Sequence, residues 1–103
     1  MINIELYRIF YVVAVNQNIT KASEKLNISQ PAITKHIKNL EDALGVILFN
    51  RTRKGVVLTP IGQKIFLEIK NALTIFDNVE NEIKNYKDND CGTIRIGIST
   101  TLV

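Results

Sequence analysis

The chain reads NISQPAITKHIKNLEDALG over residues 27–45. Ser29 suits a helix N-cap, and Pro31 is tolerated in a first turn, where the N–H that proline lacks would have no intrahelical partner. Gly45 is the residue type expected just past a helix C-terminus. Between them the apolar residues recur on one helical stripe: Ile33, Ile37, Leu40 and Leu44. The stretch predicts a helix over residues 30–44. The polar side chains of its N-terminal half, Gln30, Thr34 and Lys35, are called the polar lip below.

Two shorter helices are predicted before it. Asn3 can cap the first, whose apolar residues recur at helical spacing up to an expected end near Asn16. We expect Thr20 to cap the second, which would run to Leu26, with Asn27 in a left-handed conformation after its end.

A small hairpin is predicted next. Two short β-prone runs lie around residues 48–51 and 56–58, and the segment between them carries Arg53, Lys54 and Gly55. The hairpin would therefore have a basic tip.

A long helix is predicted over residues 60–87, because Thr59 and Pro60 repeat the pairing of a cap with a proline. Its apolar residues fill the a and d positions of more than three heptads. So long a helix cannot bury this seam against so small a globule, and we expect pairing with a second copy as a homodimer, packing on another domain being the alternative. The predicted dimerisation residues are Ile65, Ile69, Ala72, Leu73, Phe76, Val79, Ile83 and Tyr86.

The fold class expected from these elements is mainly α, a winged helix-turn-helix followed by a long dimerisation linker helix. The winged helix-turn-helix, with three helices and a β-hairpin wing, would occupy residues 1–59, and the linker helix residues 60–87. Residues 88–103 combine a polar, glycine-ended hinge with the alternating pattern of a strand.

The positive charge gathers in the first part of the chain. Residues 1–60 hold 8 basic and 4 acidic residues, residues 61–103 hold 5 and 6, and the whole chain has a net charge of +3. This distribution favours an anionic partner for the first part.

Little in the sequence suits catalysis. The chain has a single cysteine, Cys91, interpreted as a loop residue, and a single histidine, His36, interpreted as a surface or backbone-contacting residue. Nothing pairs a nucleophile with a base, so we expect no enzyme, no metal site and no cofactor. With no leader and no membrane-spanning apolar run, we expect a cytoplasmic protein with no membrane partner.

The polar lip would contact base edges if the helix over residues 30–44 enters the major groove of DNA. Gln30 can present an amide to adenine, Thr34 a hydroxyl and a methyl group to a base edge, and Lys35 an ammonium to guanine, while Pro31 presents apolar surface. A solvated helix face is the other interpretation, and on pattern alone the two are evenly balanced.

The hairpin tip is likewise open to two interpretations, a DNA contact or a solvated surface. Arg53 and Lys54 at a turn are usually only exposed charges, but beside a polar lip we favour contact with phosphate or the minor groove. The alternative function is a helical dimerisation or protein-interaction module without specific DNA binding. A small-molecule sensor is disfavoured, because convergent polar groups around an apolar pocket are lacking.

Over nearly its whole length the sequence resembles the LysR-type transcriptional regulators. The resemblance rests on a linked pattern of Ser29, Gln30, Pro31 and Ala32, then Leu40, Glu41, Leu44 and Gly45, then Leu48, Phe49 and Arg51, then Leu58, Thr59 and Gly62. The run GTIRIGIS looks like the first strand of that family's effector-binding domain. We therefore expect a DNA-binding fragment without inducer response, since a small-molecule inducer would bind the absent domain.

The resemblance implies a bacterial transcription factor that binds partly palindromic promoter DNA as a homodimer or tetramer, with antiparallel linker helices. It implies base-edge contacts from Gln30, Pro31, Thr34 and Lys35, a wing contact from Arg53 and phosphate contacts from Thr20 and Lys21. Lys38, Arg51 and Lys54 complete the candidate DNA-binding residues. Lys35 stands where arginine is frequent, so guanine readout there is expected to be weaker or shifted.

Overall fold

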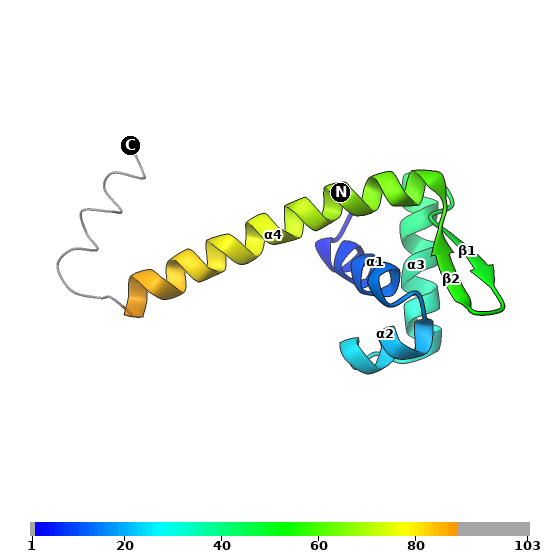
Figure 1. Ribbon diagram of the computed structural model, residues 1–103, viewed down its shortest axis with the longest axis horizontal. Helices are drawn as coiled ribbons and strands as arrows, with labels where there is room; N and C mark the ends of the chain where they lie inside the picture. Colours follow the sequence, from blue (N-terminus) through cyan, green and yellow to red (C-terminus); the bar gives the residue numbers. More distant parts are fainter. Residues whose placement is uncertain (1, 89–103) are drawn as a thin grey trace. The chain divides into compact units, whose positions relative to one another are not determined.

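The computed structural model describes residues 2–88 and contains six elements in this part of the chain. Figure 1 shows them in order: α1 (Ile4–Asn16), α2 (Ile19–Leu26), α3 (Gln30–Leu44), β1 (Phe49–Thr52), β2 (Gly55–Leu58) and α4 (Pro60–Asp88). This confirms the mainly helical, winged helix-turn-helix fold class. The chain forms two compact units, the first ending at Asn71 within α4 and the second beginning at Ala72.

The ends of α1 lie where the sequence predicts them. The side chain of Asn3 accepts a hydrogen bond from the N–H of Glu5 at 2.8 Å, and Gln17 adopts a left-handed conformation, with φ 54°, just after Asn16. These caps satisfy backbone groups that have no partner inside the helix.

The predicted start of α2 is wrong. Asn18, not Thr20, is the N-cap, because Asn18 has an extended backbone and its side-chain oxygen accepts from the N–H of Lys21 at 2.9 Å. Asparagine is the stronger capping residue of the two, so the helix begins at Ile19. Its end at Leu26 agrees with the prediction, as does the left-handed Asn27, with φ 56°.

The boundaries of α3 are confirmed. Ser29 Oγ accepts from the N–H of Ala32 at 3.3 Å, and proline stands in the first turn. At the other end, Gly45 has φ 75°, and its N–H donates to the carbonyl of Glu41 at 2.7 Å.

The predicted hairpin is present, with its first strand one residue later than expected. The strands β1 and β2 are antiparallel, with Phe49 opposite Leu58 and Thr52 opposite Gly55. Gly55 has φ 142°, and a Cβ atom there would lie 2.2 Å from the carbonyl oxygen of Gln17. Only glycine lets the hairpin approach the turn between α1 and α2 this closely.

The first unit has a core of side chains from α1, α3 and the hairpin. Its largest fully buried side chains are Phe10, Val13, Ile33, Leu40 and Leu48. The ring of Phe10 packs on that of Phe49, with centroids 5.3 Å apart. Of the apolar stripe of α3, Ile33, Ile37 and Leu40 are buried and Leu44 is half-buried.

The start of α4 is fastened to the base of the hairpin. Thr59 Oγ1 donates to the carbonyl of Ile47 at 2.7 Å and accepts from the N–H of Gly62 at 3.0 Å. This confirms the predicted cap. Gly62 is needed there, because a Cβ atom at this position would lie 2.3 Å from the carbonyl oxygen of Leu48.

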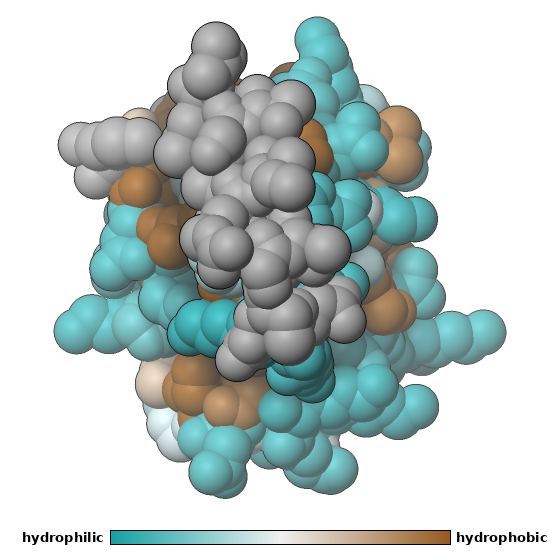
Figure 2. Space-filling model, turned by 90° about the vertical axis from the view of Figure 1, so that its left-hand side faces the viewer, coloured by the Kyte–Doolittle hydropathy of each residue, from teal (hydrophilic) through white to brown (hydrophobic). Residues whose placement is uncertain are grey.

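The predicted dimerisation seam of α4 divides into buried and exposed residues. Ile69 and Leu73 are buried, whereas Phe76, Val79 and Ile83 remain 44–50% exposed. Ile65 and Tyr86 are half-buried and Ala72 is exposed. Brown, hydrophobic surface lies among teal, hydrophilic side chains in several places on the face shown in Figure 2. Dimerisation through this seam stays a prediction.

Some of the predicted features fall on residues outside the described range. The strand predicted within residues 88–103, most of the hinge before it, and Cys91 lie there. Within residues 2–88, no helix is both long and apolar enough to cross a membrane.

Candidate nucleic-acid interface

Every candidate DNA-binding residue lies at the surface. All ten are exposed, and they come from α2, α3, β1 and the loop between the strands: Thr20, Lys21, Gln30, Pro31, Thr34, Lys35, Lys38, Arg51, Arg53 and Lys54. All ten side chains are therefore accessible to a ligand.

Six of the ten line one open hollow, which we call the α3 hollow. They are Gln30, Pro31, Thr34, Lys35, Lys38 and Arg51. Five of the six stand on α3, where residues spaced three or four apart share a face, and this face is turned away from the buried stripe. The structure thus brings together the polar lip that the sequence predicts.

Two further residues of the α3 hollow were missed by the sequence analysis. Ile19 and Ser23 line it from α2, four positions apart on one side of that helix. The helical period alone could have paired them with each other, but not with α3, because that pairing depends on how α2 packs.

The other four candidates do not line the α3 hollow. Thr20 and Lys21 lie in the first turn of α2, and Arg53 and Lys54 form the loop between β1 and β2. The hydroxyl of Thr52 donates to the carbonyl of Gly55 at 3.1 Å and closes this loop.

The charge of the α3 hollow has one sign. Its lining contains the cations Lys35, Lys38 and Arg51 and no carboxylate. With an amide from Gln30 and a hydroxyl from Thr34 beside them, these groups suit an anionic ligand that also carries hydrogen-bonding edges.

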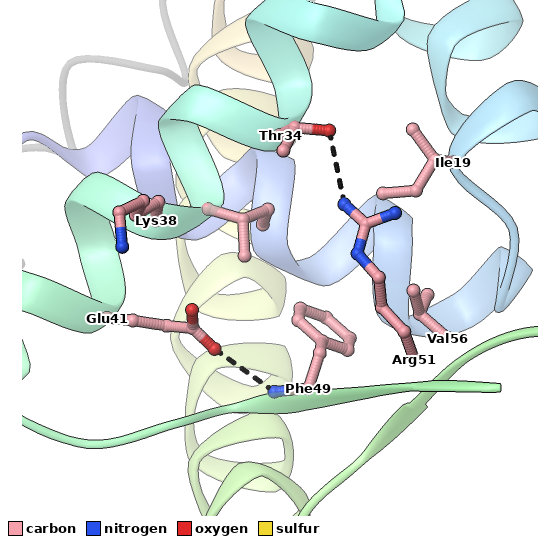
Figure 3. A pocket seen from close by; sticks show the side chains of 8 residues that line it. Ile19, Thr34, Lys38, Glu41, Phe49, Arg51 and Val56 are labelled. Atoms are coloured by element: carbon pink, nitrogen blue, oxygen red, sulfur yellow. Dashed lines mark hydrogen bonds between the residues drawn. The ribbon is translucent and has the colours of Figure 1, made fainter.

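The hairpin is held against α3 by the carboxylate of Glu41, a residue of that helix. Glu41 Oε2 accepts from the backbone N–H of Leu48 at 2.7 Å and from that of Phe49 at 3.2 Å, the second of which is drawn in Figure 3. On the opposite strand, the N–H of Val56 donates to the carbonyl of Gln17 at 3.1 Å. Both strands are therefore fixed through their backbones.

A second hollow continues from the first, between α3 and the hairpin. Figure 3 shows its apolar and polar lining side chains, which are Ile19, Thr34, Ile37, Lys38, Glu41, Phe49, Arg51 and Val56. Across it, Arg51 Nη2 donates to Thr34 Oγ1 at 3.5 Å. The first strand of the hairpin thus reaches a side chain of the polar lip directly.

Metal ligands do not gather in the described part of the chain. Among residues 2–88 there is no group of three or more histidine, cysteine, aspartate or glutamate side chains placed to hold a metal ion.

Comparison with known proteins assigns the family. The family model of the bacterial regulatory helix-turn-helix proteins of the lysR family matches residues 4–63. The RuBisCO operon transcriptional regulator of Allochromatium vinosum is 32% identical over 101 residues, which cover 98% of this chain and 33% of that protein. The transcriptional dual regulator GltC of Bacillus subtilis is 37% identical over 95 residues, or 92% of this chain and 32% of that protein.

A solved structure agrees with this. The crystal structure of the BenM DNA-binding domain with catB site 1 DNA has a TM-score of 0.77 at 32% identity, over 82% of this chain and 93% of that one. The chain therefore belongs to the LysR family of bacterial regulatory helix-turn-helix proteins. It spans about a third of the length of the curated relatives it matches.

Proposed function

We propose that this chain acts in sequence-specific binding of double-stranded DNA for transcriptional regulation. The α3 hollow carries the proposal, because it combines three cations, an amide and a hydroxyl with no carboxylate. The BenM structure, a complex of a similar domain with DNA, supports DNA as the ligand. In this arrangement the N-terminal half of α3 enters the major groove.

Each residue of the polar lip is assigned a different base contact. The amide of Gln30 suits adenine, the ammonium of Lys35 suits the acceptors of guanine, and the hydroxyl and methyl of Thr34 suit a base edge. Pro31 adds apolar surface beside them.

The remaining cations and the start of α2 are assigned to the DNA backbone. Lys38 and Arg51 border the α3 hollow, where phosphates flank the major groove. Thr20 and Lys21 would meet phosphates near the start of α2. Arg53 and Lys54 would reach phosphate or the minor groove from the tip of the wing.

The proposed binding unit is a homodimer formed through α4. Large apolar side chains left exposed on this helix support it, Phe76, Val79 and Ile83 among them. A two-fold dimer would place two copies of α3 in successive major grooves, about 34 Å apart, on a partly palindromic site.

The proposed activity is binding without catalysis and without a cofactor of this chain. The relatives it matches are named as transcriptional regulators, which supports this. Its DNA ligand would place it in the bacterial cytoplasm.

Selection from a pool of random duplexes, followed by sequencing, tests the proposal. Run at two salt concentrations, it should enrich a two-fold symmetric site, with binding that weakens steeply as salt rises because released counterions contribute to affinity. Equal recovery of all sequences, or no recovery at either salt concentration, would overturn it.

A further inference from the structure

Arg51 and Thr34 meet across the space between the hairpin and α3. Arg51 Nη2 donates to Thr34 Oγ1 at 3.5 Å, as Figure 3 shows. Both residues are exposed and both line the α3 hollow. The contact joins a cation of the wing to a hydroxyl that the proposed function assigns to base reading.

The direction of the Arg51 side chain follows from the strand pairing. Directly opposite residues of an antiparallel pair share a face, as do residues two apart on one strand. Arg51 lies opposite Val56, which is 5% exposed, and two residues after Phe49, which packs on Phe10. Arg51 therefore stands on the inner face of the hairpin, towards α3.

The backbone around this pair is fixed. The N–H of Phe49, two residues before Arg51, donates to Glu41 at 3.2 Å, and the N–H of Val56 donates to the carbonyl of Gln17 at 3.1 Å. Arg51 is thus presented to α3 from a hairpin in which each strand is held by a backbone hydrogen bond to the rest of the domain.

The chemistry of the two groups sets the direction of the hydrogen bond. A guanidinium only donates, whereas a hydroxyl has one proton to donate and two lone pairs that accept. Thr34 therefore accepts from Arg51, and its own proton is left for an outside acceptor. In the major groove the acceptors are guanine O6 and N7, adenine N7 and thymine O4, whereas the amino groups of cytosine and adenine donate.

We propose that Arg51 is a positioning residue that holds the Thr34 hydroxyl as a hydrogen-bond donor to a base acceptor. Base preference at one pair of the site then depends on a residue of the wing. This inference rests on the proposed function and names a further determinant of its specificity.

A role in charge alone is the competing account of Arg51. Within the described part of the chain no carboxylate forms an ion pair with Arg51. Its charge is therefore available to phosphate as well. Loss of affinity on removing it would not separate the two accounts, whereas loss of base preference would.

The test compares base preferences of purified variants by selection and sequencing. Thr34→Val, which keeps the shape without the hydroxyl, and Arg51→Met should each reduce discrimination at the same base pair, by up to about tenfold, the size of one hydrogen bond. The double variant should lose no more discrimination at that pair than either single variant. Thr34→Ser, which keeps a hydroxyl, should retain it.

Two further variants separate charge from geometry. Arg51→Lys keeps the charge without the planar fork, so it should preserve the salt dependence of binding and lose the preference. Arg53→Met removes a wing cation that does not line the α3 hollow, and should lower binding to all sequences with the preference intact. Since the substituted side chains are exposed, thermal unfolding midpoints should match the wild type.

Two results would overturn the inference. One is an Arg51→Met variant that binds all sequences more weakly by the same factor. The other is a change of preference by Arg51→Met in the Thr34→Val background, which would mean that Arg51 reads a base itself. If the wild type enriches no site at all, the proposed function fails, and this inference fails with it. That outcome can be told apart from the two results above, because in both of them the wild type still selects a site.

Discussion

Glu41 and Leu48 are joined by a hydrogen bond of 2.7 Å from the backbone N–H of Leu48 to the carboxylate of Glu41. The same oxygen also accepts from the N–H of Phe49 at 3.2 Å. One side chain of α3 thus satisfies two donors where the chain enters the wing, and charge-assisted hydrogen bonds of this kind are stronger than neutral ones. The placement of the wing against α3 depends on it.

Removing this carboxylate should destabilise the fold. Glu41→Ala leaves two part-buried N–H groups without their acceptor, so we expect the free energy of unfolding to fall by about 2–3 kcal/mol. Asp42→Ala, at the exposed neighbour, should change it by less than about 0.5 kcal/mol. Urea denaturation measures both, and equal values for the two variants would show that Glu41 does not anchor the wing.

Two glycines with positive φ should differ sharply in their tolerance of alanine. At Gly45 a Cβ atom meets nothing within 4 Å, so Gly45→Ala should cost only the backbone strain, about 1–2 kcal/mol. At Gly55 the Cβ atom would also lie 2.2 Å from the carbonyl oxygen of Gln17, and the hairpin would have to move away. Gly55→Ala should therefore cost clearly more in thermal unfolding, and a cost no larger than that of Gly45→Ala would contradict this close approach.

The corrected start of α2 can be tested by paired substitutions. Asn18→Ala removes the cap and should lower the free energy of unfolding by about 1 kcal/mol. Thr20→Ala, inside the first turn, should change it by less than about 0.5 kcal/mol. If chemical denaturation gave the larger loss for Thr20→Ala, the capping assignment would have to be reversed.

The seam of α4 makes a prediction about assembly. Phe76→Asp or Ile83→Asp places a charge where an apolar contact with a second copy is proposed, and should give monomers in analytical ultracentrifugation. Asn81→Asp introduces the same side chain at an exposed position outside the seam, and should leave the dimer intact. Dimers that persist in both seam variants would show that these residues pack elsewhere.

The base-reading and phosphate roles should separate in binding assays. Gln30→Ala should cost on the order of 1–3 kcal/mol on the selected site and little on random DNA. Arg53→Ala should weaken both and, if it contacts phosphate, flatten the slope of log affinity against log salt by about one unit. Losses of equal size on both kinds of DNA for Gln30→Ala would remove its assigned role.

The parts of the fold that the sequence predicts are those governed by local chemistry. The start and end of α3 follow from Ser29, Pro31 and Gly45, and the start of α4 from Thr59, because caps act over a few residues. The predicted cap of α2 was wrong because Thr20 lies two residues after Asn18, a stronger capping residue whose side chain accepts from the N–H of Lys21.

The parts that the sequence did not predict depend on contacts between distant residues. Glu41 reaches donors seven and eight positions away, and Arg51 reaches Thr34 across 17 positions. Ile19 joins the α3 hollow only through the packing of α2. The polar lip could be named from its own helix, whereas its neighbours required the tertiary structure.

The way the hairpin is held has a consequence for how its tip can vary. The backbone N–H of Val56 is bound to Gln17 and that of Phe49 to Glu41, so the hairpin is secured below the tip, by groups that do not involve the side chains of residues 53 and 54. Changes at residues 53 and 54 therefore leave the hydrogen bonds that hold the hairpin in place. We expect that a loop of different length or charge can be grafted between Thr52 and Gly55 with the fold retained, and that in the proposed complex such a graft would change the preference for the flanks of the DNA site.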